Sequence, residues 1–190
     1  MEILKQKIVA EGKNLGRGIL KIDSFLNHQI DAQLMEAVGE DIAKQFAHTN
    51  PDRILTAEVS GLIPAAMTGK AMGNIPVVYA RKRKPITMME PVYVETAPSH
   101  TKGNEVSLMV SPEFLHAGER ILIVDDFLAS GRTIDALVRI VKSAGAELVG
   151  ISAVVEKTFE GGREMLSSWN VPIYAAATIV DMSEGKIVLA

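Results

Sequence analysis

The chain has 190 residues, of which 47% are hydrophobic, and its formal net charge is -3 at pH 7. This length suits a single domain with a substantial core, and the composition is not that of a disordered chain. The negative charge disfavours a general nucleic-acid binder, and the absence of cysteine excludes disulfides, thiolate catalysis and cysteine-ligated metals.

The N-terminal segment, from Met1 to Gly18, places charged residues among its apolar ones. It has no apolar run long enough for a signal peptide or a membrane span, so we expect a cytoplasmic protein without a membrane partner. A helix is expected after Asp31, a plausible N-cap, because apolar residues then recur at helical spacing as far as Phe46. The Asn-Pro pair at positions 50–51 ends that helix.

Apolar strands and helices alternate along the rest of the chain. The expected strands cover residues 53–59, 75–80, 120–124, 148–155 and 171–179, with a further possible strand at 105–110. The expected helices cover residues 63–72, 132–144 and 162–169. Residues 81–104 are rich in charge, contain prolines and lack a helical period, which indicates a long mobile loop or an exposed hairpin. The alternation predicts an α/β fold with a central parallel sheet flanked by helices, whose ligands bind beyond the carboxyl ends of the strands.

The most informative stretch runs from Ile121 to Thr133. Four apolar residues lead into two adjacent carboxylates, Asp125 and Asp126, which a strand would hold at the carboxyl edge of the sheet. A loop of small residues follows, whose backbone N–H groups can converge on a phosphate together with the positive end of the next helix. The residues of this loop are Ala129, Ser130, Gly131, Arg132 and Thr133. Taken alone, the stretch could also be a strand that ends in a solvated Asp-Asp turn.

This order of strand, acid pair, loop and helix resembles the ribose-phosphate-binding motif of type I phosphoribosyltransferases. The resemblance implies that Asp125 and Asp126 hold the ribose 2- and 3-hydroxyls of 5-phosphoribosyl 1-pyrophosphate, and that residues 129–133 hold its 5-phosphate. Ala129 stands where many members carry threonine, which removes one possible hydroxyl contact and leaves the backbone donors. The resemblance covers nearly the whole chain, so we expect one domain, with a small N-terminal hood (residues 1–30) over the base and a core of residues 31–190.

Two further segments match the resembled family around the pyrophosphate. Ser60 and Gly61 form the small turn after the first strand, where backbone groups would cradle pyrophosphate, although the turn could also be an ordinary connection. Arg81 and Lys82 follow the next strand, and their charge would stabilise the departing pyrophosphate, although such a run is often a solvated surface. The segment 99–102 resembles part of the flexible loop that closes over the reacting centre, or else it is an exposed loop.

The base is predicted from two places in the chain. Lys157 follows an apolar strand, where the resembled purine enzymes use a lysine to meet the 6-oxo group, and Phe159 supplies an aromatic face for the ring. Residues 18–31 resemble the purine-covering hood of bacterial xanthine phosphoribosyltransferases, in which Leu20 and Asn27 match base-contacting positions. Without the resemblance, Lys157 would be an exposed lysine, Leu20 a core residue and Asn27 a turn cap.

These matches predict transfer of a phosphoribosyl group to xanthine, giving xanthosine 5-monophosphate and pyrophosphate. The resemblance implies Mg²⁺ that bridges substrate oxygens rather than a fixed protein-bound metal, and a homodimer. An adenine, guanine or hypoxanthine transferase remains the nearest alternative. A non-catalytic regulator that senses the phosphoribosyl donor is the other; it would need a DNA-binding domain or a basic surface, and the sequence offers neither.

Overall fold

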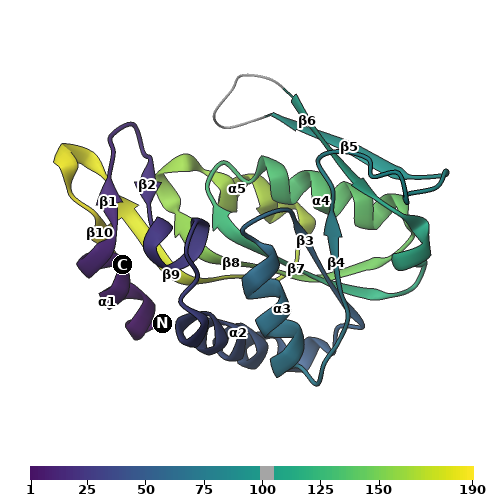
Figure 1. Cartoon of the computed structure of the whole chain (residues 1–190), viewed down its shortest axis with the longest axis horizontal. Helices are drawn as coiled ribbons and strands as arrows, with labels where there is room; N and C mark the ends of the chain where they lie inside the picture. Colours follow the sequence, from purple (N-terminus) through teal and green to yellow (C-terminus); the bar gives the residue numbers. More distant parts are fainter. Residues whose placement is uncertain (99–104) are drawn as a thin grey trace.

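The computed structural model describes residues 1–98 and 105–190. Within these residues the centre of the molecule is a six-stranded sheet with the strand order β10-β9-β8-β7-β3-β4, in which every pairing except β10 with β9 is parallel. Its strands are β3 (Arg53–Ala57), β4 (Val77–Ala80), β7 (Arg120–Leu128), β8 (Glu147–Lys157), β9 (Ile173–Asp181) and β10 (Val188–Leu189). The predicted α/β fold with a central parallel sheet is therefore confirmed (Figure 1).

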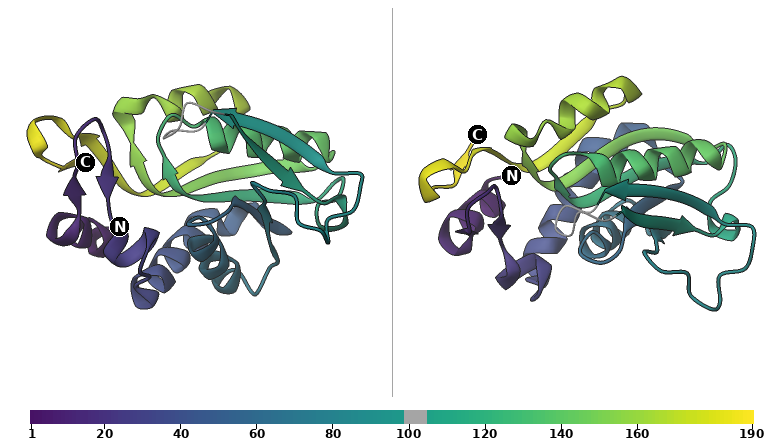
Figure 2. Two further views of the ribbon diagram at one scale, coloured as in Figure 1. Left: turned by 45° about the horizontal axis from the view of Figure 1, so that its top comes forward. Right: turned by 90° about the horizontal axis from the view of Figure 1, so that it is seen from above.

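Helices cover both faces of this sheet (Figures 1 and 2). One face carries α1 (Glu2–Glu11), α2 (Ala32–Phe46) and α3 (Leu62–Ala71), and the other carries α4 (Arg132–Ser143) and the short α5 (Gly162–Leu166). Asp31 caps α2 as predicted, because its side chain accepts a hydrogen bond from the backbone N–H of Leu34.

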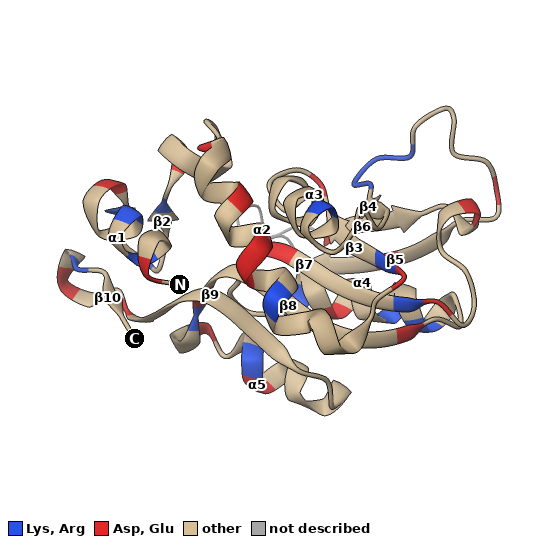
Figure 3. Cartoon of the chain, turned by 90° about the horizontal axis from the view of Figure 1, so that it is seen from below, with Lys and Arg blue, Asp and Glu red and all other residues tan. Residues whose placement is uncertain are grey.

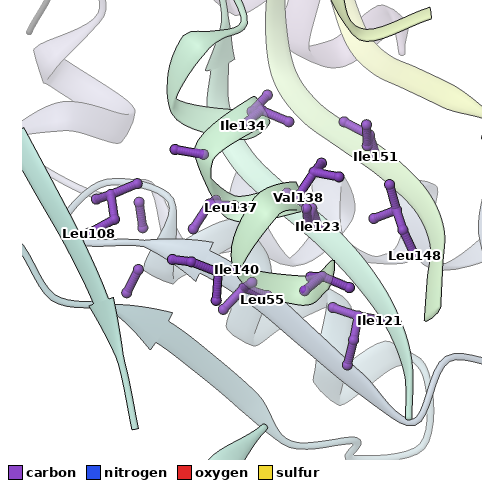
Figure 4. Close-up of a cluster of buried hydrophobic side chains, with 14 of the residues drawn as sticks. Leu55, Leu108, Ile121, Ile123, Ile134, Leu137, Val138, Ile140, Leu148 and Ile151 are labelled. Atoms are coloured by element: carbon purple, nitrogen blue, oxygen red, sulfur yellow. The ribbon is translucent and has the colours of Figure 1, made fainter. Parts of the chain in front are cut away.

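Apolar side chains on alternate positions of the strands form two cores, one on each face. Figure 4 shows the first, in which Leu137 and Ile140 of α4 pack against Leu55, Ile121 and Ile123 of the sheet. The second joins α1, α2 and α3 to the opposite sides of the same strands, with Phe25 and Phe46 fully enclosed. Burial on both faces explains why β7 and β8 are nearly continuous apolar runs in the sequence.

The segment after β4 returns as a hairpin, one of the two structures predicted for it. Strand β5 (Tyr93–Pro98) pairs antiparallel with β6 (Glu105–Val110), so the possible strand at 105–110 is confirmed but belongs to a separate two-stranded sheet. A backbone bridge between Arg81 and Met109 attaches the hairpin to the end of β4. On its other side, Arg139 of α4 donates to the carboxylate of Glu95.

Several predicted boundaries differ from the observed ones. Strand β7 continues through Asp125 and Asp126 to Leu128, whereas the sequence indicated an end at residue 124. Strand pairing explains the extension, because Asp125 lies opposite Ala153 of β8 and Leu128 lies opposite Glu156. The helix predicted at 162–169 ends at Leu166 and continues only as a 3-10 turn through Trp169.

The N-terminal 30 residues contain structure that the sequence analysis did not predict. Helix α1 is followed by the two-residue strands β1 (Lys13–Asn14) and β2 (Leu20–Lys21) and by a π-helical segment (Asp23–Asn27). Only Leu4 and Ile8 of α1 are buried, so its apolar periodicity is weak. Both termini lie beside β9 (Figure 1), because the N-terminal amine donates to the carbonyl of Ala176 and the N–H of Ala190 donates to the carbonyl of Thr178.

Charged residues of both signs are interspersed over the helices and strands seen from the α2–α3 side (Figure 3). Among the described residues, none of the helices combines the length and apolar character needed to cross a membrane.

Candidate active site

A cavity of about 180 Å³ lies where β3 and β7 end, at the carboxyl edge of the sheet. It is enclosed by the loop after β3, the start of the segment after β4, and the loop between β7 and α4. The described residues that line it are Ala57, Glu58, Val59, Ser60, Gly61, Lys82, Asp125, Asp126, Phe127, Ala129, Gly131, Arg132, Thr133 and Ile134. Most of the residues predicted to hold the phosphoribosyl donor therefore meet around one space.

The two adjacent carboxylates occupy different environments. Asp125 is buried, with 5% of its surface exposed, and its Oδ1 accepts a hydrogen bond of 3.0 Å from the backbone N–H of Asp126. Burial, followed by the neighbouring charge of Asp126, raises the pKa of Asp125 well above its usual range. Asp126 is only partly buried. The pair therefore combines one enclosed carboxyl group with one that reaches toward solvent.

Asp126 is held by a hydrogen bond to each of its oxygens. Its Oδ1 accepts from the backbone N–H of Phe127 at 2.9 Å, and its Oδ2 accepts from Nδ2 of Asn27 at 2.9 Å. Asn27 comes from the N-terminal segment, 99 positions away in the chain. A residue predicted for the base thus contacts a residue predicted for the ribose.

The loop between β7 and α4 has the backbone geometry of an anion cradle. Gly131 adopts φ +77°, a conformation that favours glycine, immediately before the first turn of α4. No described side chain caps that helix end, and its first residues, Arg132 to Ile134, line the cavity, so the positive end of the helix dipole lies beside it. Ser130 lies between cavity-lining residues of this loop without contributing to the lining.

A glycine of the following loop supports this cradle from outside. The N–H of Gly162 donates to the carbonyl of Ala129 at 3.0 Å. A Cβ added to Gly162 would lie 2.2 Å from that same oxygen, so no other residue fits without moving the loop. Gly162 was not among the predicted site residues, although the Gly-Gly pair at 161–162 is a visible signal of close backbone approach.

Gly61 allows the loop after β3 to approach the acids. A Cβ at this position would lie 2.5 Å from Oδ1 of Asp125 and 2.4 Å from Oγ1 of Thr56. Ser60 and Gly61 both line the cavity, as predicted for residues that would cradle pyrophosphate. Thr56 is fully buried, and its hydroxyl has no hydrogen-bond partner among the described residues.

Glu58 binds both residues of the predicted cationic pair, Arg81 and Lys82, and it was not among the predicted site residues. Its carboxylate accepts from Nε of Arg81 at 2.8 Å and from the backbone N–H of Lys82 at 2.6 Å. Lys82 lines the cavity, whereas the Arg81 side chain lies over the ring of Tyr79, with its guanidinium carbon 5.6 Å from the ring centre. Arg81 instead lines a second cavity of about 390 Å³ beside β4.

Two of the residues predicted to contact the base, Lys157 and Phe159, lie at the end of β8, against the N-terminal segment. Nζ of Lys157 donates to the carbonyl oxygen of Gly18 at 2.9 Å, pairs with Glu160, and lies 5.8 Å from the centre of the Phe127 ring. The Phe159 ring is half-exposed and lies against Gly18.

Leu20 packs, partly buried, against the α2-side core. None of the four predicted base residues (Leu20, Asn27, Lys157 and Phe159) lines the 180 Å³ cavity, but Asn27 reaches it through Asp126.

Two other expectations concern the closing loop and metal binding. The predicted closing segment at 99–102 lies outside the described residues. Among the residues that the structure does describe, no cluster of three or more His, Asp or Glu side chains is arranged to hold a metal ion.

The sequence matches the phosphoribosyl transferase domain family over residues 22–170, most of its length. The chain belongs to this family. A xanthine phosphoribosyltransferase of Deinococcus deserti is 46% identical over 185 residues, covering 97% of this chain and 95% of that protein. Another from Geobacillus thermodenitrificans is 43% identical, covering 98% of this chain and 96% of that protein. The predicted resemblance to bacterial xanthine phosphoribosyltransferases is therefore confirmed.

Solved structures share the fold at lower sequence identity. The adenine phosphoribosyltransferase of Rhodothermus marinus superimposes with a TM-score of 0.76 at 21% identity, covering 94% of this chain and 100% of that one. The corresponding enzyme of Thermoanaerobacter pseudethanolicus gives a TM-score of 0.75 at 24% identity, covering 92% of this chain and 99% of that one. At these identities the likeness establishes the type I phosphoribosyltransferase fold alone.

Proposed function

We propose that this chain is a purine-salvage enzyme that transfers the phosphoribosyl group of 5-phosphoribosyl 1-pyrophosphate to xanthine, giving xanthosine 5-monophosphate and pyrophosphate. The observation that carries the proposal is the single cavity shared by the acid pair, the 129–133 loop and the 58–61 loop. The names of the curated relatives, which cover almost the whole chain, support xanthine as the base.

The donor would bind in this cavity with its 5-phosphate at the start of α4. Backbone N–H groups of residues 129–133 and the helix dipole would neutralise the phosphate without a lysine. The ribose hydroxyls would then face Asp125 and Asp126, and the pyrophosphate would face Ser60, Gly61 and Lys82. Arg81 would act at a distance or after the segment rearranges, because its side chain is held by Glu58.

In the proposed step the bond between the ribose C1 and a pyrophosphate oxygen breaks, and its electron pair leaves with pyrophosphate. A nitrogen lone pair of the base forms the new bond to C1, and the proton of that nitrogen is released. Positive charge develops on the ribose during this exchange, and stabilisation of that charge is the role proposed for Asp125 and Asp126, which line the cavity. Lys82 and the 58–61 backbone would stabilise the leaving group.

Lys157 is the proposed donor to the 6-oxo group of the base. An ammonium group has three N–H donors, and Gly18 and Glu160 take two of them, which leaves one for an oxo oxygen. Phe159 would stack on the ring, and Leu20 and Asn27 would close the base site from the hood (residues 1–30). A lysine donor disfavours adenine, whose 6-amino group is itself a donor.

Magnesium is proposed to enter with the donor, held mostly by substrate oxygens and water. A cavity lined by two neighbouring carboxylates suits an ion that the substrate carries, since such an ion needs few protein ligands. Its chemistry there would be to neutralise pyrophosphate charge, and Asp125 and Asp126 are the residues that would face it.

A homodimer in the cytoplasm is also proposed, as the family resemblance implies. Exposed apolar side chains after the edge strand β4, among them Ile86 and Met89, would suit such a contact. Light scattering on a sizing column tests it: a mass of about twice 20.5 kDa supports the dimer, and a monomer at all concentrations contradicts it.

A base panel tests the proposed reaction. The purified chain is incubated with magnesium, the phosphoribosyl donor and xanthine, hypoxanthine, guanine or adenine, and nucleotide formation is followed. We expect the highest kcat/KM with xanthine. Faster turnover of hypoxanthine or guanine would overturn the base assignment, and turnover of none would favour a donor-sensing regulator.

A further inference from the structure

Asn27 makes a contact that base recognition does not require. Its Nδ2 donates to Oδ2 of Asp126, a carboxylate that lines the donor cavity, at 2.9 Å. The other oxygen of Asp126 is fixed by the backbone N–H of Phe127. The Phe127 bond fixes one oxygen of the carboxylate, and the second bond, from Asn27, fixes the other and so restricts rotation about the Cβ–Cγ bond further.

The segment that carries Asn27 is anchored well enough to serve as a fixed support. Asn27 ends the π-helical segment that begins at Asp23, directly after the buried side chains of Phe25 and Leu26. The backbone N–H of Gln29 donates to the carbonyl of Asp23 at 2.7 Å, and that of Asp31 donates to the carbonyl of Phe25 at 3.0 Å. Each of these two hydrogen bonds joins a residue before Asn27 to a residue after it, so together they fix the backbone that carries its side-chain amide.

We propose that Asn27 is a positioning residue for the donor site: through Asp126 it orients the carboxylate that meets the ribose, so that the hood contributes to donor binding before any base arrives. The inference rests on the proposed function and deepens it. A carboxamide carries two N–H donors and one oxygen acceptor, so the bond to Asp126 leaves one N–H and the oxygen for the base. The two roles are compatible in one side chain.

A double-mutant cycle separates this role from base contact. Binding of 5-phosphoribosyl 1-pyrophosphate with magnesium, without any base, is measured by calorimetry for the wild type, Asn27→Ala, Asp126→Ala and the double variant. We expect Asn27→Ala to weaken donor binding about three- to tenfold when Asp126 is present. In the Asp126→Ala background the same change should alter the affinity less than twofold, because the partner is gone.

Two further variants guard against a loss of fold. Asn27→Asp keeps the size of the side chain and places a second carboxylate against Asp126, so it should weaken donor binding more than Asn27→Ala; circular dichroism at the assay temperature checks that both variants are folded. Ser24→Ala alters the hood at a side chain whose hydroxyl donates to Glu11 and not to Asp126, and its donor affinity should stay within twofold of the wild type. Donor affinity that is unaltered by Asn27→Ala, or that falls equally in both backgrounds, would overturn the inference.

Failure of the inference about Asn27 can be told apart from failure of the proposed function. A wild-type chain that does not bind the donor would overturn both. A chain that binds the donor but makes no xanthosine 5-monophosphate would overturn only the choice of base, and the cycle would still decide the role of Asn27.

Discussion

At the scale of single residues, the two adjacent acids differ in burial and therefore in their effect on stability. Asp125 is enclosed between the end of β7 and Gly61, and burial raises its pKa. A carboxyl group whose pKa is raised by folding binds more protons in the folded state. It therefore destabilises the fold as the pH rises above the pKa of the unfolded chain, and it has no such effect below that value.

Asp125→Asn should accordingly stabilise the protein at pH 7 while it lowers turnover. The amide keeps an oxygen for the N–H of Asp126 and removes a buried titratable group. We expect a gain of about 1–2 kcal/mol in the free energy of unfolding, which disappears below about pH 4. Urea unfolding at both pH values measures this gain. A destabilised Asp125→Asn at pH 7 would contradict the assigned effect of burial.

Asp126→Asn, at a partly exposed position, should change stability much less and lower turnover at least tenfold.

At the scale of elements, the turn between β8 and α5 links the two halves of the proposed site. Glu156 is 2% exposed and accepts two hydrogen bonds from Arg163, at 2.7 and 2.6 Å, and Arg163 also donates to the carbonyl of Ile173. This pair closes the turn that carries Lys157 at one end and Gly162, the neighbour of the phosphate loop, at the other.

Arg163→Met should destabilise the protein by about 2–4 kcal/mol, because it leaves the buried carboxylate of Glu156 without its partner. The double variant Arg163→Met with Glu156→Gln removes the buried charge as well and should recover part of the loss. Thermal unfolding of both variants checks this. Equal melting temperatures for Arg163→Met and the wild type would show that the pair does not fix the turn.

Most of these elements could be predicted from the sequence, and the exceptions have physical reasons. The strands and α2 follow from apolar periodicity and from the cap at Asp31, because local spacing determines them. Helix α1 was missed because only Leu4 and Ile8 meet the core. The end of β7 was placed too early because the strand continues by pairing with β8, and pairing partners are not visible in local sequence.

The candidate site divides in the same way. Asp125, Asp126 and all of residues 129–133 except Ser130 line one cavity, since they are contiguous in the chain, and their role in donor binding stays a prediction. The contact between Glu58 and Arg81, and that between Asn27 and Asp126, join residues far apart in sequence. Such pairs depend on how the layers pack, so the residue types alone did not indicate them.

At the scale of the whole molecule, a stabilising ion pair lies at the opposite end of β3 from the candidate site. Arg53, at the start of β3, binds the carboxylate of Glu119 with its Nε and a terminal nitrogen, at 3.1 and 2.6 Å. Arg53, together with the backbone and side chain of His116, lowers the pKa of Glu119 to about 2. A lowered pKa contributes stability that is present above the unfolded value near 4.5 and is lost as the pH falls toward 2.

Glu119→Gln should therefore reduce stability at pH 7 by about 1–2 kcal/mol, the lower part of the possible range because the pair lies near the surface. The difference from the wild type should shrink between pH 4.5 and pH 2, and turnover at pH 7 should stay within twofold. Unfolding at a series of pH values, with turnover measured beside it, checks both statements. A stability difference that persists unchanged at pH 2 would refute the assigned cause.

The most direct test of the central claim is a crystal structure with 5-phosphoribosyl 1-pyrophosphate and magnesium bound. We expect the 5-phosphate within hydrogen-bonding distance of backbone N–H groups of residues 129–133, and the ribose hydroxyls facing the carboxylates of Asp125 and Asp126. A phosphate bound elsewhere, or acids that turn away from the sugar, would contradict the claim.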